Sequence, residues 1–319
     1  MGPALCLLSA VCFGALGIFG KLAFEAGVSP GTLLLIRFGL AAVVLGAFLA
    51  FRGKHGNTTP GRFLAAAIGL GALGYAVQAS LYFEALARMD ASLLSLVFYL
   101  YPLLVTATAV ALGRDRLTAG TVAALLAASG GVMLVLLGAG GVAIDGIGVT
   151  LAFGSALTYT AYILFSDRVV HRMPPILLTT LVLAGAAAAL AVRALFTGGV
   201  DLGFGMTGWF WLACIVIVST VLPIVAFFAG LRRTGPSTAA ILSTFEPVVT
   251  TVLASMLLHE SLTATQLAGG LLVLSSVVVL QLKGGAGRRR ADAGQRPDRE
   301  PRRRLRSGPA ASWFRSPAG

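Results

Sequence analysis

The sequence predicts an all-α membrane protein whose ten transmembrane helices form a 5+5 inverted-topology repeat. Three observations lead to this fold class. Hydrophobic residues make up 57% of the 319 residues and charged residues 11%, whereas a soluble domain carries about a quarter charged residues. Apolar runs of roughly 20 residues, each able to cross about 30 Å of hydrocarbon, recur along the chain. The second half also repeats features of the first half at a shift of 145 residues.

The apolar runs define ten predicted spanning segments joined by short loops. They lie at approximately 3–24, 30–51, 62–87, 91–112, 119–139, 146–166, 175–196, 207–230, 236–258 and 263–282. Short loops imply that consecutive helices are antiparallel neighbours. The remaining residues, 283–319, are rich in Arg, Gly, Pro and Ala, and we expect them to be disordered because they cannot bury enough apolar surface to fold.

Basic residues in the loops predict the orientation of the chain. Segment 3–24 is expected to remain as a membrane helix, because no Lys or Arg precedes its apolar run as in a signal peptide. Little basic charge besides Arg88 and Arg193 falls on one side of the predicted bundle. The other side receives Arg52, Lys54, Arg62, Arg114, Arg116, Arg168, Arg172, Arg232 and Arg233. Basic loops stay cytoplasmic, so we expect a multi-pass protein of the plasma (inner) membrane with both termini in the cytoplasm.

The internal repeat rests on residues that seldom match by chance in an apolar sequence. At the shift of 145, Pro102 falls on Pro247, and "RLT" at 116–118 falls on "SLT" at 261–263. Five helices are an odd number, so the second repeat must insert upside down relative to the first. The predicted units are a first repeat at 1–139, a second repeat at 140–282 and a basic tail at 283–319. Inverted repeats are typical of alternating-access transporters, which bind substrate near the midplane between the repeats.

The charge, cysteines and histidines exclude several classes of function. The tail from Lys283 carries 11 Lys and Arg against 3 Asp and Glu, so it holds +8 of the net charge of +12. We expect this tail to contact anionic lipids or merely to enforce topology. A nucleic-acid role is not supported, because no soluble domain is present to read a groove. No metal site or cofactor is predicted from the scattered Cys6, Cys12, Cys214, His55, His171 and His259, and no phosphate-binding loop suggests direct use of ATP.

Residues 3–282 resemble a known family through several motifs. The second repeat ends in "EPVVTTVLASMLLHESLTATQLAGGLLVL", and the first opens with "FGALGIFGK" at 13–21, where Phe13 replaces a usual tryptophan. Arg37 matches an arginine common in the second helix. With the repeat architecture, these motifs look like the EamA type of the drug/metabolite transporter superfamily. The first repeat departs from the pattern, with "GRDRLT" in place of a Gly-Glu pair. The resemblance implies transport of a small molecule without naming the substrate.

Glu246 and Pro247 lie together about ten residues into the ninth predicted segment, some 15 Å deep. A carboxylate at that depth costs on the order of 3 kcal/mol, and proline removes a backbone donor. Corresponding interruptions in two halves indicate a transport site, and the first repeat has Tyr101 before Pro102. We therefore expect Glu246 to bind substrate or a proton; the alternative is a structural charge that neutralises a buried base.

The other candidate site residues are polar or proline positions in the same part of the predicted bundle. Arg37 could pair with Glu246, contact a substrate carboxylate or extend to the membrane surface. Gln78 is a candidate pore-lining amide, and Pro223, its counterpart at the shift of 145, predicts a kink. Ser243 and Thr250 share the helix face of Glu246. We expect Tyr101, Pro102 and Pro247 to line the same cavity.

Further residues are predicted to support the bundle. Glu84 with Arg88, and Lys21 with Glu25, are spaced for i,i+4 ion pairs. Glu260 and Asp115 are expected to cap the helices that follow them. Aromatic side chains could wall the pocket; these are Tyr75, Tyr82, Phe98, Tyr99, Tyr101, Tyr159, Tyr162 and Phe227.

The sequence therefore favours a secondary active transporter, a monomer or homodimer, that exports small polar or amphipathic metabolites such as amino acids. One alternative is a flippase for a lipid or lipid-linked sugar, which requires a laterally open groove. A second alternative is an intramembrane hydrolase. The hydrolase is the weaker alternative, because "FGSAL" around Ser155 lacks the flanking glycine pattern of a nucleophile and no histidine falls at mid-membrane depth.

Overall fold

The computed structural model describes residues 1–51, 60–113, 119–137, 145–170, 172–197, 199–234, 239, 242–276 and 278–279. Within these ranges the chain is helical and contains no strand. Seven helices are long and apolar enough to cross a membrane: Gly2–Glu25, Pro30–Phe51, Gly61–Leu86, Ala91–Ala111, Gly146–Ser166, Pro175–Phe196 and Met206–Phe227. The protein is therefore an all-α, multi-pass membrane protein.

Some of these spans consist of several shorter elements. The α-helices are α1 (Gly2–Glu25), α2 (Pro30–Phe51), α3 (Gly61–Gly69), α4 (Ala76–Leu86), α5 (Ala91–Phe98), α6 (Tyr101–Ala111), α7 (Ala119–Leu137), α8 (Gly146–Val170), α9 (Pro175–Phe196), α10 (Met206–Val216), α11 (Leu222–Thr234) and α13 (Glu246–Leu257). Two π-helical segments, η1 (Leu70–Tyr75) and η2 (Ile217–Val221), join α3 to α4 and α10 to α11. A final apolar helix covers Ala264–Ser276.

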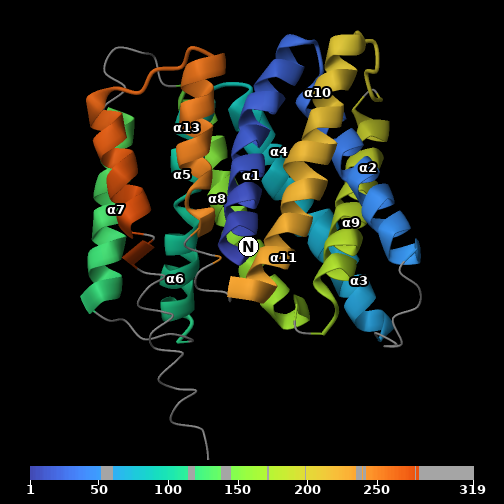
Figure 1. Ribbon diagram of the computed structural model, residues 1–319, viewed down its shortest axis with the longest axis horizontal. Coiled ribbons are helices and arrows are strands. Elements are labelled where there is room, and N and C mark those ends of the chain that lie inside the picture. The colour runs from blue at the N-terminus through green and yellow to red at the C-terminus, as the bar shows by residue number, and fades with distance from the viewer. Residues whose placement is uncertain are drawn as a thin grey trace, which may run out of the picture.

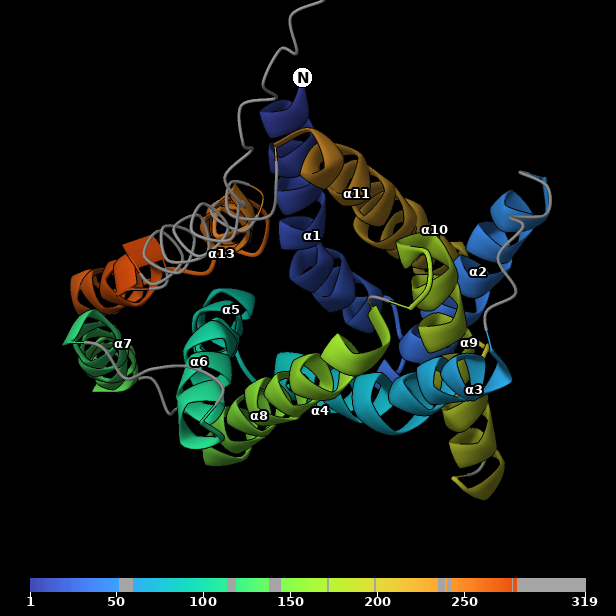
Figure 2. The same cartoon turned by 90° about the horizontal axis from the view of Figure 1, so that it is seen from below.

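The helices form a bundle with α1 near its centre (Figures 1 and 2). α1 packs against α10, α11 and α13, while α8 packs against α4, α5 and α6. α7 and the helix Ala264–Ser276 lie side by side at one end of the longest axis, and α2, α3 and α9 lie at the other end. Apolar side chains from both halves of the chain form the main buried core, among them Phe38, Phe83 and Leu212.

Prolines mark where several helices begin. Pro30 and Pro175 occupy the first positions of α2 and α9, and Pro102 and Pro247 occupy the first turns of α6 and α13. A proline fits there because the first N–H groups of a helix have no intrahelical partner. α5 and α6 are consequently separated by a turn at 99–100, and a turn at 244–245 directly precedes α13.

The helix limits agree with seven of the predicted spanning segments. α7 begins at the predicted residue of its segment and has 19 residues, whereas Glu246–Leu257 and Ala264–Ser276 are shorter than a full span. The number of ten spanning helices therefore remains a prediction. The predicted basic tail, Asp115 and most of the basic loop after α2 lie outside the described residues.

Candidate functional site

A cavity of about 150 Å³ lies inside the bundle, lined mainly by the first half of the chain together with Tyr159 and Glu246 of the second half. Its wall is largely aromatic, with an acid, a base and an amide as its strongest polar groups. The lining residues are Phe13, Leu16, Arg37, Tyr75, Gln78, Ala79, Tyr82, Phe83, Phe98, Tyr99, Tyr101, Tyr159 and Glu246. This volume lies below the 300–1,000 Å³ of usual ligand pockets, so the cavity must widen to accept most metabolites.

The aromatic wall is a connected set of rings. Tyr101 meets Tyr159 edge to face at 4.7 Å between ring centroids, and Phe98 lies 5.3 Å from Tyr101. Tyr159 stacks on Tyr162 at 5.8 Å, and Tyr162 in turn lies 5.6 Å from Tyr75. Such ring pairs contribute about 0.5–1.5 kcal/mol each beyond their burial. The wall is therefore held in shape by contacts between α5, α6, α8 and η1.

Glu246 is the acid of the cavity, and the break before α13 positions it there. It is the first residue of α13. The Tyr99 hydroxyl donates to the Ser243 carbonyl oxygen at 2.7 Å and lies 3.3 Å from Glu246 Oε2. Tyr99 itself belongs to the corresponding break between α5 and α6. The acid is thus held where the two interrupted helices meet.

Arg37, the base of the cavity, extends inward from α2 and is 4% exposed. Its Nε donates to Thr220 Oγ1 of η2 at 2.9 Å. The guanidinium carbon lies 5.3 Å from the ring centroid of Phe38 and 5.7 Å from that of Phe83, within cation–π range. Among the described residues no carboxylate lies within 4.0 Å of the guanidinium. The pairing of Arg37 with Glu246 that the sequence suggested is therefore absent, and burial also excludes extension to the membrane surface.

Gln78 contributes an amide from α4. Its Nε2 donates to Ser155 Oγ at 3.0 Å, and Ser155 Oγ donates to the Gln78 carbonyl oxygen at 3.1 Å. Gln78 is 6% exposed and lines the cavity, so its side chain both joins α4 to α8 and borders the cavity. Ser155 serves as a bridge between helices in this arrangement.

Comparison with known proteins gives the family. A family model described as "EamA-like transporter family" matches residues 1–137 and 146–282. The chain belongs to the EamA-like transporter family. This makes it a transporter and not an enzyme, with a small-molecule substrate and contact with lipid.

Relatives of this EamA-like transporter are similar over most of their length. The Bacillus subtilis (strain 168) protein named "Uncharacterized transporter YcbK" is 27% identical over 279 residues, covering 84% of this chain and 88% of that protein. An "Uncharacterized transporter" of Archaeoglobus fulgidus is 28% identical over 278 residues, covering 87% and 95%. A solved crystal structure aligns with a TM-score of 0.63 at 20% identity, over 89% of this chain and 98% of that one, and so shares the fold.

Two of the other predicted site residues of this EamA-like transporter lie beside the cavity and not in its wall. Ser243 donates its hydroxyl to the Ala239 carbonyl oxygen at 3.0 Å. Thr250 is buried, and its hydroxyl contacts the Gly14 carbonyl oxygen at 2.9 Å and that of Glu246 at 3.1 Å. Both side chains fix the backbone around Glu246. We find them in supporting positions around the acid.

The three predicted prolines are also absent from the cavity wall. Pro102 and Pro247 lie one residue beyond Tyr101 and Glu246, in the first turns of their helices. Pro223 lies in α11 directly after η2, where its carbonyl oxygen accepts a hydrogen bond from Ser9 Oγ at 2.9 Å. Pro102 and Pro247 thus determine where the helices break, and the residues before them, Tyr101 and Glu246, supply side chains to the cavity wall.

The structure corrects the predicted role of Glu260. Instead of capping the helix that follows it, Glu260 accepts hydrogen bonds from the Ala91 N–H at 2.9 Å, the Ser92 N–H at 3.0 Å and the Ser92 hydroxyl at 2.8 Å. These groups belong to the N-terminus of α5 in the first half of the chain. The sequence placed Glu260 correctly in a turn, but which helix end faces that turn depends on packing between the halves.

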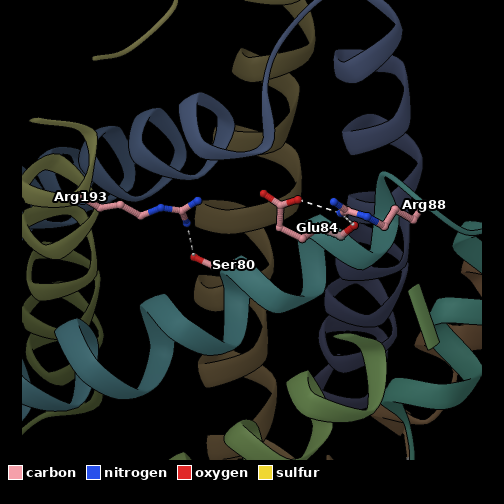
Figure 3. Close-up of polar contacts among 4 residues, drawn as sticks. All are labelled: Ser80, Glu84, Arg88 and Arg193. Carbon is pink, nitrogen blue, oxygen red and sulfur yellow. Dashed lines mark hydrogen bonds and ion pairs between the residues drawn. The ribbon is translucent and has the colours of Figure 1, made fainter. Parts of the chain in front are cut away.

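The ion pair predicted between Glu84 and Arg88 is present. Arg88 Nη1 lies 2.8 Å from Glu84 Oε2 and also donates to the Glu84 carbonyl oxygen at 2.7 Å (Figure 3). Arg193 of α9 points toward the same helix and donates to Ser80 Oγ at 3.5 Å. In the described part of the chain, Lys21 and Glu25 form no ion pair within 4.0 Å.

Proposed function

We propose that this EamA-like transporter is a secondary active transporter of the plasma membrane that exports small polar or amphipathic metabolites such as amino acids. Transport occurs by alternating access between two inverted five-helix repeats, and Glu246 carries the coupling proton. The observation that supports the proposal most is the internal cavity, in which Glu246 faces an aromatic wall that also carries Arg37 and Gln78.

The chemistry of the cavity fits a zwitterionic or amphipathic substrate. An amino group can bind at the Glu246 carboxylate, a carboxylate at the Arg37 guanidinium, and an apolar side chain against the aromatic rings. Removal from water disfavours the charged form of a carboxyl group, which suits an acid that takes up and releases a proton. Among the described residues, Glu246 contacts the Tyr99 hydroxyl and forms no ion pair. Its carboxylate oxygens are therefore available to a proton or to the amino group of a substrate.

Helix limits support the two-repeat architecture. Four helices in the first half begin 145 residues before four helices in the second half: Pro30 and Pro175, Gly61 and Met206, Tyr101 and Glu246, Ala119 and Ala264. The two stretches that match the family model, 1–137 and 146–282, are offset by the same 145 residues. The turn at 99–100 likewise corresponds to the turn at 244–245.

The contacts between helices also support the two-repeat architecture, because contacts of the first helix in one half recur for the first helix in the other half. α1 packs on α11 and α13, and α8 packs on their counterparts α4 and α6. The carbonyl oxygens of Gln78 and Pro223, 145 residues apart, each accept a hydrogen bond from a serine of the packed helix, Ser155 or Ser9. Such reciprocal packing is expected if the two halves have opposite orientations in the membrane. With basic loops facing inward, both termini would then be cytoplasmic.

The decisive experiment is substrate transport by the purified full-length protein in proteoliposomes. A pH gradient is imposed, and uptake and efflux of a panel of labelled amino acids are measured for the wild-type protein and for Glu246→Gln. We expect Glu246→Gln to abolish transport driven by the pH gradient, because the amide takes up no proton. Size-exclusion chromatography should show that the variant stays folded.

Glu84→Gln is the matched control, since Glu84 is also a carboxylate of the helical bundle but lies in the Arg88 ion pair. It should transport like the wild-type protein. Full transport and unchanged pH dependence in Glu246→Gln would remove the assigned role of Glu246. Absence of transport for every amino acid in the wild-type protein would overturn the substrate class.

A further inference from the structure

A second, larger hollow lies on the side of the bundle, outside the cavity that contains Glu246. It is a groove of about 660 Å³ between α3 with η1 on one side and α8 on the other. Its apolar walls include Leu73, which is 79% exposed, and Phe165, which is 60% exposed. Exposed apolar side chains on a membrane protein face lipid, so the groove opens toward the hydrocarbon.

The length of the groove matches one leaflet of a bilayer. Its lining residues on α3 and η1 extend from Arg62 to Gly74, a rise of twelve residues or roughly 18 Å along a helix. Half of a hydrocarbon core is about 15 Å. Arg62 is the second residue of α3, at the end of the span, and the lining residues farthest from it along the two walls are Gly74 and Thr158. An acyl chain in the groove would therefore reach from the surface toward the middle of the membrane.

The mouth of the groove is basic. Arg62 lies with its guanidinium carbon 4.9 Å from the ring centroid of Phe63, and Arg172 lies 5.8 Å from the same ring. Both arginines are exposed, and within the described part of the chain neither forms an ion pair. Two guanidinium groups beside one ring at headgroup level can bind a phosphate. They also lie on the side predicted to be cytoplasmic, where anionic lipids are enriched.

We propose that this groove is a binding site for an anionic phospholipid, with the phosphate at Arg62 and Arg172 and one acyl chain between α3, η1 and α8. The combination of an acyl-length apolar groove with a basic mouth selects this occupant over a neutral lipid. The site is separate from transport and does not depend on the substrate proposed above. It also spans a single leaflet, whereas a flippase requires a path across both.

Binding can be tested on the purified full chain by native mass spectrometry with phosphatidylglycerol and with phosphatidylcholine of the same acyl chains. We expect one tightly retained phosphatidylglycerol and much weaker retention of phosphatidylcholine. Each arginine near a membrane surface contributes a factor of about five, so Arg62→Gln with Arg172→Gln should weaken phosphatidylglycerol binding roughly 30-fold. Arg193→Gln with Arg233→Gln makes the same change in net charge elsewhere and should leave binding unchanged.

A second variant tests the acyl chain independently. A Cβ added at Gly69, in the groove, meets no atom within 4 Å, so the backbone position tolerates a side chain, and the ring of Gly69→Phe should occupy the groove. We expect it to abolish phosphatidylglycerol binding, whereas Gly39→Phe, at a similarly open position of α2, should not. Equal retention of the two lipids, wild-type binding by the double arginine variant, or wild-type binding by Gly69→Phe would each overturn the proposal. The basic tail is the same in every variant, so it cannot account for a difference in phosphatidylglycerol binding between variants.

Discussion

The Tyr99 hydroxyl joins the two interrupted helices, since it donates to the Ser243 carbonyl oxygen and lies beside Glu246. Tyr99→Phe keeps the ring that packs on Tyr101 but removes these contacts. A hydrogen bond of this kind contributes about 0.5–1.5 kcal/mol, so we expect transport in proteoliposomes to fall about threefold to tenfold.

Tyr162→Phe is the control for this prediction, because the Tyr162 ring stacks on Tyr159 while its hydroxyl has no hydrogen bond with another described residue. Transport by Tyr162→Phe should stay near the wild-type rate. If the two variants lose the same amount of transport activity, the hydrogen bonds of the Tyr99 hydroxyl have no specific role in transport.

Asp90, in the turn between α4 and α5, predicts a pH dependence of stability. Partial burial and the nearby carboxylate of Glu260 raise the pKa of Asp90, and Lys21 acts in the opposite direction. A raised pKa in the folded protein means that the folded state binds the proton more tightly than the unfolded state does. The contribution of Asp90 to stability is therefore complete below its ordinary pKa and is lost as the pH rises through the raised value.

Asp90→Asn should accordingly unfold at a higher temperature than the wild-type protein at pH 7 in detergent solution. The difference should shrink as the pH falls through the raised pKa, because Asp90 then becomes protonated in the wild-type protein. Thermal unfolding followed across this pH range measures the effect. A difference independent of pH would assign the change to another cause, such as a lost favourable charge at the N-terminus of α5.

The sequence could single out a residue as a candidate for the site where its side chain is tolerated in few environments of a membrane protein. A carboxylate at membrane depth and a proline inside a helix each require a special setting, which is why Glu246 and Pro247 could be singled out. Tyr99 could not be selected from the other tyrosines, because an aromatic residue in a membrane helix packs equally well in many places. Its role arises only when the break in one half meets the break in the other.

At the level of elements, α9 packs on α3 and η1 through two glycines. A Cβ at Gly185 would overlap the Ile68 carbonyl oxygen, and a Cβ at Gly71 would overlap that of Val182. Neither backbone can move away without displacing a helix. Gly185→Ala should therefore destabilise the protein by about 1–3 kcal/mol, the usual cost of overpacking, and lower the unfolding temperature by several degrees.

Gly46→Ala offers the comparison for Gly185→Ala, because its Cβ would lie 3.9 Å from Thr180 Cγ2, an ordinary contact. Its unfolding temperature should match that of the wild-type protein. If both alanine variants unfold at the same temperature, backbone proximity at Gly185 does not limit stability.

Most helix limits were predictable because apolar length and proline positions determine them. The π-helical segments η1 and η2 were not, since a π-helical turn leaves no mark in composition. η1 lies just before Gln78 and η2 just before Pro223, the two corresponding positions that the sequence had singled out. η2 also supplies the Thr220 hydroxyl that accepts a hydrogen bond from Arg37. Local geometry of this kind depends on which groups of the neighbouring helices must be accommodated.

At the scale of the whole molecule, the shift of 145 residues predicted which helices correspond, but not which of them touch. Glu260 illustrates the limit, because its partners Ala91 and Ser92 belong to a distant part of the chain. An inverted repeat, as proposed above, would constrain packing only by requiring that contacts come in exchanged pairs.

The bond between Glu260 and the N-terminus of α5 has a mechanical consequence. It ties the two halves together at one end of the bundle, with two backbone N–H groups and a hydroxyl held by one carboxylate. Separating the halves at that end would leave all of these groups to find water or new partners. In the alternating access proposed above, we therefore expect the opposite end to open first from this conformation, with the Glu260 turn as the pivot.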